Sequence, residues 1–238
     1  MGSSTWARCS MSSREATTVE VPQGTHGADR VDQPLGLRLL LARVLRKPVP
    51  TWVTWFHCLG GLTFFTFLVL VVTGIVLACN YVPSPDHARA SVAWIDSSLP
   101  FGRLVRNLHR WSAYAMVVLV FAHMLRVFVH GAYRRPRELN WVIGVLMLLT
   151  VLAFGFTGYL LPWDQKGYWA TNVGINIAGS VPFVGSFLAS LLRGGDTVGA
   201  LTLLRFYGLH VLVLPLFLAA CLVGHFLMIR KQGISRPL

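Results

Sequence analysis

The sequence predicts an all-α fold, an up-down bundle of four transmembrane helices with surface helices in the connection between the third and the fourth. Three observations support this fold class. Only 13% of the 238 residues are charged, whereas about a quarter of the residues are charged in a soluble domain. Three runs without formal charge each exceed the roughly 20 residues that a helix needs to cross the hydrocarbon layer of a membrane. A fourth run of sufficient length is apolar but places several histidines at membrane depth.

The predicted spans follow one another along most of the chain. They cover about residues 55–79, 108–130, 139–163 and 206–229. Together they define a predicted membrane domain, residues 55–238. Residues 170–192 also lack charge, but they contain Asn172, Asn176 and Pro182. We therefore expect this stretch to lie along the membrane surface rather than to cross it.

The region before the first span has a different composition. Residues 1–34 are rich in Ser and Thr and lack the apolar core of a secretory signal, so we expect a disordered extension. Residues 35–54 are expected to form an amphipathic segment on the negative side of the membrane. The net charge of +12 would suggest a nucleic-acid partner in a soluble protein. Here the basic residues flank apolar runs, which favours membrane lipid as the partner and argues against nucleic acid.

The basic residues also predict how the chain crosses the membrane. Four spans put both termini on one side, and ten basic residues lie on that side against six on the other. The ten precede the first span, fill the link between the second and third, or follow the fourth: Arg38, Arg43, Arg46, Lys47, Arg134, Arg135, Arg137, Arg230, Lys231 and Arg236. Since short basic loops stay on the negative side, both termini are predicted to lie on the cytoplasmic or equivalent side.

Four histidines lie in two of the predicted spans. His109 and His123 lie 14 residues apart in the second span, and His210 and His225 lie 15 apart in the fourth. These two spans run in the same direction in an up-down bundle, so the histidines form two pairs, each at one depth. The 14-residue interval separates the pairs by about 21 Å along a helix. Pro215 lies within the longer interval, where a Pro-linked distortion can absorb the extra residue.

Two imidazoles that face each other across a bundle core are typical of bis-histidine haem ligation. A single histidine in a membrane helix is about as often packed against its neighbours or hydrogen-bonded to them. Four histidines at matched depths on parallel helices make that alternative less favourable. We therefore expect two haems stacked across the membrane, which would let electrons cross from one face to the other, with a quinol as the natural partner.

Glycines and arginines agree with this hypothesis. Two glycine pairs share an interval of 14 residues and are expected to leave room for porphyrins, although glycine is common in membrane helices in general. They are Gly60 and Gly74 in the first span and Gly144 and Gly158 in the third. Haem propionates require cationic partners at the membrane edges, and ordinary anchoring at the interface is the alternative role for such cations. The arginines placed to pair with propionates are Arg106, Arg110, Arg126 and Arg137.

Seven stretches over about residues 47–238 resemble the cytochrome b6 family, the haem-bearing half of a split cytochrome b. They are "FHCLGGLT", "LHRWSAYAMVVLVFAHMLRV", "RRPRELNWVIGV", "GFTGYLLPWDQKGYWA", "VPFVGSFLASLLRGG", "LLRFYGLHVLVLPL" and "HFLMIRKQGISRPL". The intervals of 14 and 15 residues between the histidines also match this family. The chain ends after "KQGISRPL", where the family is expected to end, and it has no P-E-W-Y motif, which the family places on a partner, subunit IV.

The resemblance implies a subunit of a quinol:cytochrome c or plastocyanin oxidoreductase, in a bacterial cell membrane or a thylakoid. Quinol would be oxidised on the positive side, with one electron passing to a Rieske iron–sulfur protein and on through a cytochrome c or f type subunit. The other would pass from the haem of His109 and His210 to that of His123 and His225 and help to reduce quinone on the negative side. This Q-cycle would be coupled to proton translocation in a dimeric complex. No side chain is expected to be a covalent catalyst.

The resemblance also implies further sites. Cys58 would bond a third haem, of the c type, through a single thioether on the negative side; the alternative is a small buried hydrophobic residue. Candidates for quinone sites lie after the third span and at the end of the fourth, and an aromatic belt at the interface is the alternative for the first group. They are Tyr159, Trp163, Tyr168 and Trp169 in the first group and Arg230 and Lys231 in the second.

Two features stay outside the resemblance. Members of the family carry acidic residues before the first span, whereas residues 33–57 here contain none. The route by which protons reach the negative-side site is therefore not assigned. His57, which directly precedes Cys58, also has no assigned role, and we do not expect it to be a haem ligand.

Other classes stay open on the sequence alone. A di-haem cytochrome that serves a dehydrogenase or a transmembrane reductase would share the histidine pairs but neither "LPWDQKGYWA" nor Cys58. A haem-free channel subunit would lack a b-type optical spectrum, and an assembly subunit without turnover would not need intact ligands. The sequence does not distinguish plastoquinone from menaquinone, plastocyanin from cytochrome c, or a photosynthetic from a respiratory host.

Overall fold

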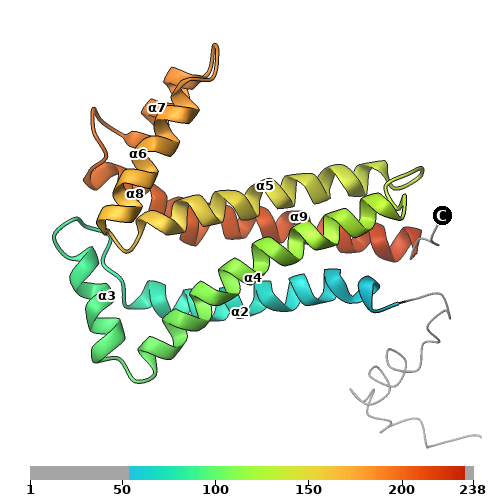
Figure 1. Cartoon of the computed structure of the whole chain (residues 1–238), viewed down its shortest axis with the longest axis horizontal. Helices are drawn as coiled ribbons and strands as arrows, with labels where there is room; N and C mark the ends of the chain where they lie inside the picture. Colours follow the sequence, from blue (N-terminus) through green and yellow to red (C-terminus); the bar gives the residue numbers. More distant parts are fainter. Residues whose placement is uncertain (1–53, 234–238) are drawn as a thin grey trace, which may run out of the picture. The chain divides into compact units, whose positions relative to one another are not determined.

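In a computed structural model of the chain, residues 54–233 are described, and every regular element in this range is helical (Figure 1). Four helical segments are long and apolar enough to cross a membrane: Trp55–Cys79, Gly102–Val129, Glu138–Leu160 and Ala200–Gln232. The predicted fold class, a bundle of four membrane-spanning helices, is confirmed for these residues. The predicted extension 1–34 and all but the last residue of the predicted segment 35–54 lie outside the described range.

The ends of three spans differ from the prediction. The second span begins at Gly102 rather than near residue 108, and the third ends at Leu160 rather than at residue 163. The fourth span is longer than predicted at both ends and covers Ala200–Gln232. Helix ends depend on local caps and on packing against neighbouring elements, which hydropathy does not register.

A 3-10 turn, Trp55–Cys58, leads into α2, Leu59–Cys79. The core of a bilayer offers no water, so a span must satisfy its polar groups internally. α2 does so for its hydroxyl groups as well as its backbone, because three threonines each donate to the carbonyl four residues earlier. They are Thr63, Thr66 and Thr73, with distances of 2.7, 2.9 and 2.7 Å.

Helix α3, Ala88–Ser97, was not predicted, and it packs against the start of α4, Gly102–Val129. Gly102 is buried, and a Cβ atom there would overlap the carbonyl oxygen of Ile95 in α3. Arg106 of α4 forms an ion pair with Asp96 of α3. The close backbone approach and the ion pair together hold α3 against α4.

The last span packs against α5, Glu138–Leu160, and is not a regular α-helix throughout. It consists of α8, Ala200–Gly208, a π-helical segment, Leu209–Val213, and α9, Leu214–Gln232. A π-helical bond spans one more residue than an α-helical bond, so this segment absorbs the extra residue in the interval between His210 and His225. Pro215, the second residue of α9, lacks the N–H that would close an α-helical bond to the preceding turn. The expected Pro-linked distortion is present in this form.

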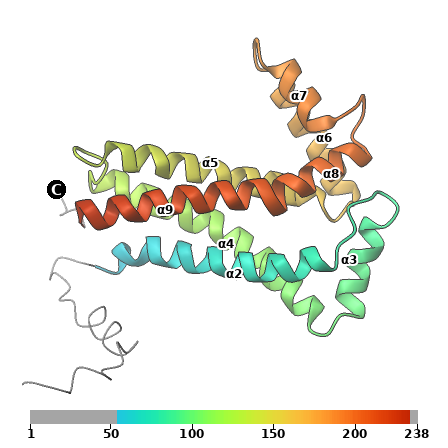
Figure 2. The ribbon, with the colours of Figure 1, turned by 180° about the vertical axis from the view of Figure 1, so that it is seen from behind.

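Two shorter helices, α6 (Gln165–Gly179) and α7 (Gly185–Arg193), form a hairpin that projects from the end of the bundle where α3 also lies (Figures 1 and 2). With 15 and 9 residues, they are shorter than a membrane span. They are the helices predicted between the third and fourth spans. A cluster of fully or nearly fully buried side chains joins them to the bundle: Ala88, Leu160, Ile175, Val198, Leu203 and Phe206.

Tyr81 ties the segment after α2 to this cluster. Its hydroxyl donates to the carbonyl of Leu161 at 2.6 Å, and its ring stacks on that of Tyr207 with the centroids 5.5 Å apart. Burial, with a smaller contribution from Tyr207, raises the pKa of Tyr81. The phenol therefore stays protonated at physiological pH and keeps its donor role.

The opposite end of the bundle is held by backbone contacts of the α4–α5 link. Arg137 Nη2 donates to the carbonyl of Gln232 at 3.1 Å, and Gln232 Nε2 donates to the carbonyl of Pro136 at 3.0 Å. These two bonds attach the last turn of α9 to the link. Both ends of the bundle are thus fixed, which sets the register between the helices that carry the histidines.

We predict that Gly102→Ala destabilises the protein by about 1–3 kcal/mol, because the added methyl group overpacks the α3–α4 contact. The measurement is the thermal unfolding midpoint of the purified protein in detergent. Gly61→Ala is the matched control, since a Cβ at that glycine meets nothing within 4 Å. Equal unfolding midpoints for the two variants would contradict this account of the α3–α4 junction.

Candidate haem sites

The first histidine pair lies in the bundle core toward the α3 end. The rings of His109 in α4 and His210 in the π-helical segment have centroids 6.4 Å apart and an interplanar angle of 63°. Two imidazoles that bind one metal ion from opposite sides, at the usual metal–nitrogen distance of about 2.0–2.1 Å, have ring centres about 6 Å apart. The observed separation therefore fits a pair of axial ligands.

Two threonines fix the protonation pattern of this pair. Thr73 Oγ1 lies 2.9 Å from His109 Nδ1, and Thr157 Oγ1 lies 3.1 Å from His210 Nδ1. Each hydroxyl gives its single proton to a backbone carbonyl, of Val69 at 2.7 Å and of Ala153 at 2.8 Å. The threonine oxygens must then accept from Nδ1–H. This leaves the lone pair of each neutral ring on Nε2, which is the form that binds a metal.

The glycines predicted to leave room lie directly against histidine rings in three of four cases. A Cβ atom would lie 2.6 Å from His210 Cε1 at Gly158, 3.0 Å from His123 Cε1 at Gly60 and 3.3 Å from His109 Cε1 at Gly74. At Gly144 the nearest atom is Met124 Sδ at 3.6 Å, which is an ordinary contact. Each of the three rings is thus seated on the bare backbone of a neighbouring helix.

The threonines were missed by the sequence reasoning, although a signal for them exists. Thr73 directly precedes Gly74, and Thr157 directly precedes Gly158. A Thr–Gly dipeptide therefore occurs twice, once in each helix that seats a histidine of the first pair. The glycine admits the ring and the threonine hydrogen-bonds its Nδ1.

The second histidine pair lies toward the end of the bundle that contains the α4–α5 link. His225 of α9 is within electrostatic range of His123 of α4. The ring of His225 lies by the backbone of Asn140, although its Nδ1 does not meet hydrogen-bond geometry there. Along α4, the 14 residues from His109 to His123 correspond to about 21 Å.

Cys58 lies at the same end as the second pair. It closes the 3-10 turn that precedes α2, two residues before Gly60, which seats the ring of His123. Its thiol is exposed and forms no disulfide with another described cysteine. Arg230 and Lys231 are exposed in the last turn of α9.

The four candidate arginines differ in how their charge is satisfied. Arg106 is paired with Asp96, and Arg110 Nε donates to the hydroxyl of Tyr114 at 3.3 Å. By contrast, Nε and Nη2 of Arg126 are buried and form no hydrogen bond within residues 54–233, and the same holds for Nε of Arg137. Arg126 lies three residues after His123 and thus faces the same side of α4. It retains the capacity to bind an anion beside the second pair.

Three of the four aromatic candidates lie together at the α3 end. Trp163 and Tyr168 meet edge to face with centroids 6.0 Å apart, and Tyr168 and Trp169 do so at 5.2 Å. Trp163 has a φ of +50°, a conformation that costs energy in a bulky residue and recurs at functional sites. Asp164 caps α6 by accepting from the N–H of Gly167 at 2.7 Å. Tyr159 is half exposed on α5, within electrostatic range of Arg110.

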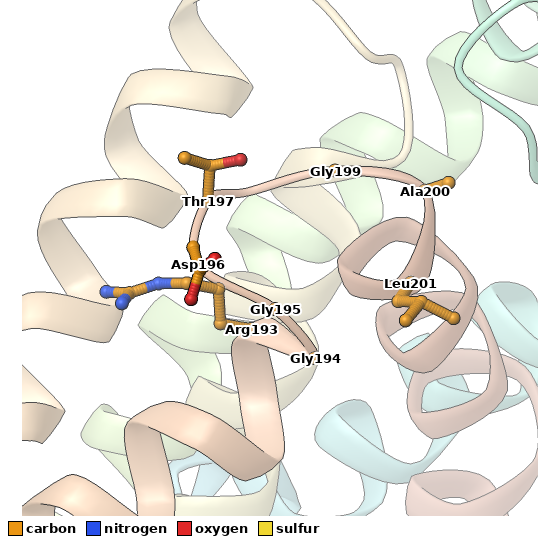
Figure 3. Close-up of a pocket in the computed structure, with 8 residues that line it drawn as sticks. All are labelled: Arg193, Gly194, Gly195, Asp196, Thr197, Gly199, Ala200 and Leu201. Atoms are coloured by element: carbon orange, nitrogen blue, oxygen red, sulfur yellow. The ribbon is translucent and has the colours of Figure 1, made fainter.

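A small pocket in the α7–α8 loop shares no residue with either histidine pair. It is lined by Arg193, Gly194, Gly195, Asp196, Thr197, Gly199, Ala200 and Leu201 (Figure 3). The side chain of Arg193 points away from the glycines of the loop (Figure 3). Its Nη2 donates to Asn176 Oδ1 at 2.6 Å. The arginine therefore braces α7 against α6.

A helical membrane bundle with two histidine pairs in its core, at different depths, is typical of membrane cytochromes. The family pattern described as "Cytochrome b/b6/petB" matches residues 44–233. The chain belongs to the cytochrome b family. It is accordingly an integral membrane protein that binds haem b and serves as an electron-transfer subunit of a quinol oxidoreductase with other subunits. This membership removes the haem-free channel from the classes considered.

Curated relatives agree with this assignment over most of the chain. A cytochrome b6 from Oltmannsiellopsis viridis is 50% identical over 207 residues, which are 87% of this chain and 96% of the relative. A cytochrome b6 from Chlamydomonas reinhardtii is 48% identical over 210 residues, 88% and 98% of the two chains. Among solved structures, a chain of "Hyperthermophilic respiratory Complex III" is similar with a TM-score of 0.79 and 32% identity. The match covers 87% of this chain and 55% of that one, so this chain spans about half its length.

We predict that Gly158→Ala removes one of the two haem b groups, because the methyl group would displace the ring of His210. Gly155→Ala, on the same helix, is the matched control, since a Cβ there meets nothing within 4 Å. The measurement is the haem-to-protein ratio from a pyridine haemochrome assay, together with the reduced-minus-oxidised spectrum. Full haem content in both variants would show that the close contact does not govern haem binding.

Proposed function

We propose that this chain is the di-haem b subunit of a quinol:cytochrome c or plastocyanin oxidoreductase. In this role it would carry electrons across the membrane in a Q-cycle coupled to proton translocation. The observation that carries the proposal is the His109–His210 pair, with its 6.4 Å separation and both Nδ1 atoms bonded to threonine. Family membership supplies the reaction class.

The residues present fit haem b at both levels of the bundle. Two neutral imidazoles at each level offer the nitrogen donors that would hold a haem iron, and the group held in this way would supply one-electron transfer. His109 and His210 would hold the group on the positive side, and His123 and His225 the group on the negative side. Gly60, Gly74 and Gly158 admit the rings, while Thr73 and Thr157 orient two of them.

The buried nitrogens of Arg126 support binding of a haem propionate. Buried guanidinium nitrogens without hydrogen bonds are costly unless an anion completes those bonds. Nε and Nη2 of Arg126, beside the second histidine pair, and Nε of Arg137 are buried in this way without a partner within residues 54–233. Arg106 already has Asp96 as its partner and would have to share its charge to bind a propionate. Arg110 is the other candidate at that end.

A covalent haem c at Cys58 is the third cofactor that we propose. The thiol is exposed, lies at the end of the second histidine pair, and is close in sequence to Gly60. A thioether bond would fix the group at the negative-side surface. The role of the chain there would be to supply the sulfur, with the cations Arg230 and Lys231 of α9 at the same end of the bundle.

The two ends of the bundle would bind quinone in different ways. Trp163, Tyr168 and Trp169, with Tyr159 near them in sequence, offer ring faces and a strained backbone for quinol on the positive side. Arg230 and Lys231 offer cations to quinone oxygens on the negative side. The termini would lie on the negative side, cytoplasmic or stromal, because ten basic residues of the sequence lie there.

The partners that we propose follow from the reaction. Quinol oxidation would need a Rieske iron–sulfur protein, a cytochrome c or f type subunit and a subunit IV-like protein that carries P-E-W-Y, in a dimeric complex. The spans leave many large apolar side chains exposed, such as Phe65, Leu125 and Leu216 at more than 60%, which suits lipid and further membrane helices. Quinol:cytochrome c and quinol:plastocyanin reductase activity of the purified complex tests the function directly.

We predict that His225→Ala abolishes the negative-side haem b and leaves the His109/His210 site at least partly occupied. Low-temperature reduced-minus-oxidised spectra and redox titration of the purified complex measure the two haems separately. His87→Ala is the control, because His87 is an exposed histidine in the α2–α3 connection. Retention of both haems in the His225 variant would refute the proposed pairing.

We also predict that Cys58→Ala removes the haem that survives denaturing electrophoresis while both haem b groups remain. The measurement is haem-dependent peroxidase staining of the gel. Cys79→Ala serves as the control, since Cys79 is an exposed cysteine at the far end of the same helix. A stained band in the Cys58 variant would exclude Cys58 as the attachment point.

A further inference from the structure

One carboxylate of the short helix α3 reaches the start of the span that carries His109. Asp96 Oδ2 accepts from Arg106 Nη1, and the two residues form an ion pair whose side chains are 28% and 32% exposed. The other ion pair within residues 54–233, Arg135–Glu138, lies at the opposite end of the bundle with 90% and 63% of its side chains exposed. Water therefore screens the charges of Asp96 and Arg106 less than those of the other pair.

The second oxygen of Asp96 is not satisfied by the fold. Its Oδ1 is buried and has no hydrogen bond within residues 54–233. A buried carboxylate oxygen without a donor costs free energy. The contact between α3 and α4 is already close at Gly102, where a Cβ atom would overlap the carbonyl oxygen of Ile95. Stability alone therefore does not explain a charged side chain at position 96.

Arg106 lies in a part of α4 that is already positive. The helix begins at Gly102, has no acidic residue in its first turn, and carries Arg103 as well. The N-terminus of a helix also has a partial positive charge of its own. Arg106 is three residues from His109, a spacing that places two side chains on the same face of a helix. Asp96 thus compensates positive charge one helical turn from a candidate haem ligand.

The second histidine pair has a different charge environment. Arg126 lies three residues after His123, and its Nε and Nη2 are buried without a hydrogen bond within residues 54–233. Glu138, the described carboxylate of this end, is exposed and paired with Arg135. The arginine one turn from the α4 histidine is therefore paired with a carboxylate at the first level of the bundle but not at the second.

We propose that Asp96 is a positioning residue that holds the guanidinium of Arg106 and lowers the reduction potential of the haem at His109 and His210. The inference rests on the proposed function, which assigns one haem b to each histidine pair. Reduction adds one electron, so a nearby carboxylate disfavours the reduced form and a nearby cation favours it. Both levels offer two imidazoles, so the axial ligands do not distinguish the two potentials. The pairing of Arg106 therefore favours the electron at the second level, which is the proposed direction of transfer.

The test is a redox titration of both haems in the intact purified complex with Asp96→Asn. Asparagine keeps the size of the side chain and an oxygen that accepts from Arg106, but it has no charge, so a merely structural role would leave the potential unchanged. We expect the potential of the positive-side haem to rise and that of the negative-side haem to stay the same. The equilibrium of the electron between the two haems should shift about threefold to tenfold toward the positive side, where tenfold corresponds to about 59 mV for one electron.

Three further variants isolate the effect of the charge. Asp86→Asn removes an exposed carboxylate from the α2–α3 connection and should leave both potentials unchanged. Asp96→Glu keeps the charge and should retain the potential of the unmodified complex. Arg106→Gln removes the cation but leaves Asp96, so the potential of the positive-side haem should fall. This opposite shift keeps the inference testable where Asp96→Asn does not assemble.

The outcomes separate the inference from the function. A purified complex that lacks two haem b groups or does not oxidise quinol would overturn the proposed function itself. A functional complex in which Asp96→Asn titrates like Asp86→Asn would overturn only the role of Asp96. Equal shifts in Asp96→Asn and Asp96→Glu would also refute that role, because loss of the charge would not be their cause. An Arg106→Gln variant whose positive-side potential does not fall would contradict it as well.

Discussion

The structure depends on keeping imidazoles neutral, correctly protonated and close to one another inside an apolar bundle. A histidine in a low-dielectric core is disfavoured in its charged form, and a neutral ring offers a metal its lone pair on only one nitrogen at a time. The Thr73–His109 and Thr157–His210 bonds set that nitrogen by occupying the other one. Each threonine can accept because its own proton is already given to its helix. Helix backbone, hydroxyl and imidazole thus form a continuous chain in which every donor has one acceptor.

Much of this arrangement could be predicted from the sequence. The contacts that could not be predicted depend on how elements distant in the sequence pack against one another. Span lengths and the depth of the histidine pairs follow from the 1.5 Å rise of a helix and from hydropathy, which are local properties. The Thr157–His210 bond joins residues 53 positions apart, and its existence depends on how two helices rotate about their axes. The same holds for α3 and the Arg106–Asp96 pair, which arise where a short polar connection packs against α4. For the extra residue between His210 and His225, the sequence predicted a distortion, but only the structure located it as a π-helical segment.

The two ends of the bundle differ in their packing and in the polarity of their side chains. At the α3 end, the fully buried cluster around Leu160 and Phe206 and the bond from Tyr81 to Leu161 keep the backbone rigid beneath the aromatic group that includes Trp163. The left-handed backbone conformation of Trp163 costs energy, so it persists only where the packing of neighbouring residues holds it in place. At the other end, partly exposed polar groups meet, such as His130, whose Nδ1 bonds to the carbonyl of Arg126. Nε and Nη2 of Arg126 have no hydrogen-bond partner within residues 54–233. Rigid packing suits the proposed orientation of quinol, whereas a polar, partly exposed surface suits contact with anions and water.

Glycine lowers the stability of a helix, so each glycine in these helices calls for a structural explanation. A glycine within a helix is less stable than alanine by roughly 0.5–1 kcal/mol, so its presence calls for a reason. At Gly158 and Gly60 the reason is contact, because a methyl group would lie 2.6 and 3.0 Å from a histidine ring. At Gly61 and Gly155 a methyl group would meet nothing within 4 Å, so helix packing within residues 54–233 does not explain them. A shared interval of 14 residues points to four glycines in the sequence, but only the contact of three of them with an imidazole ring distinguishes a seat for histidine from the general frequency of glycine in membrane helices.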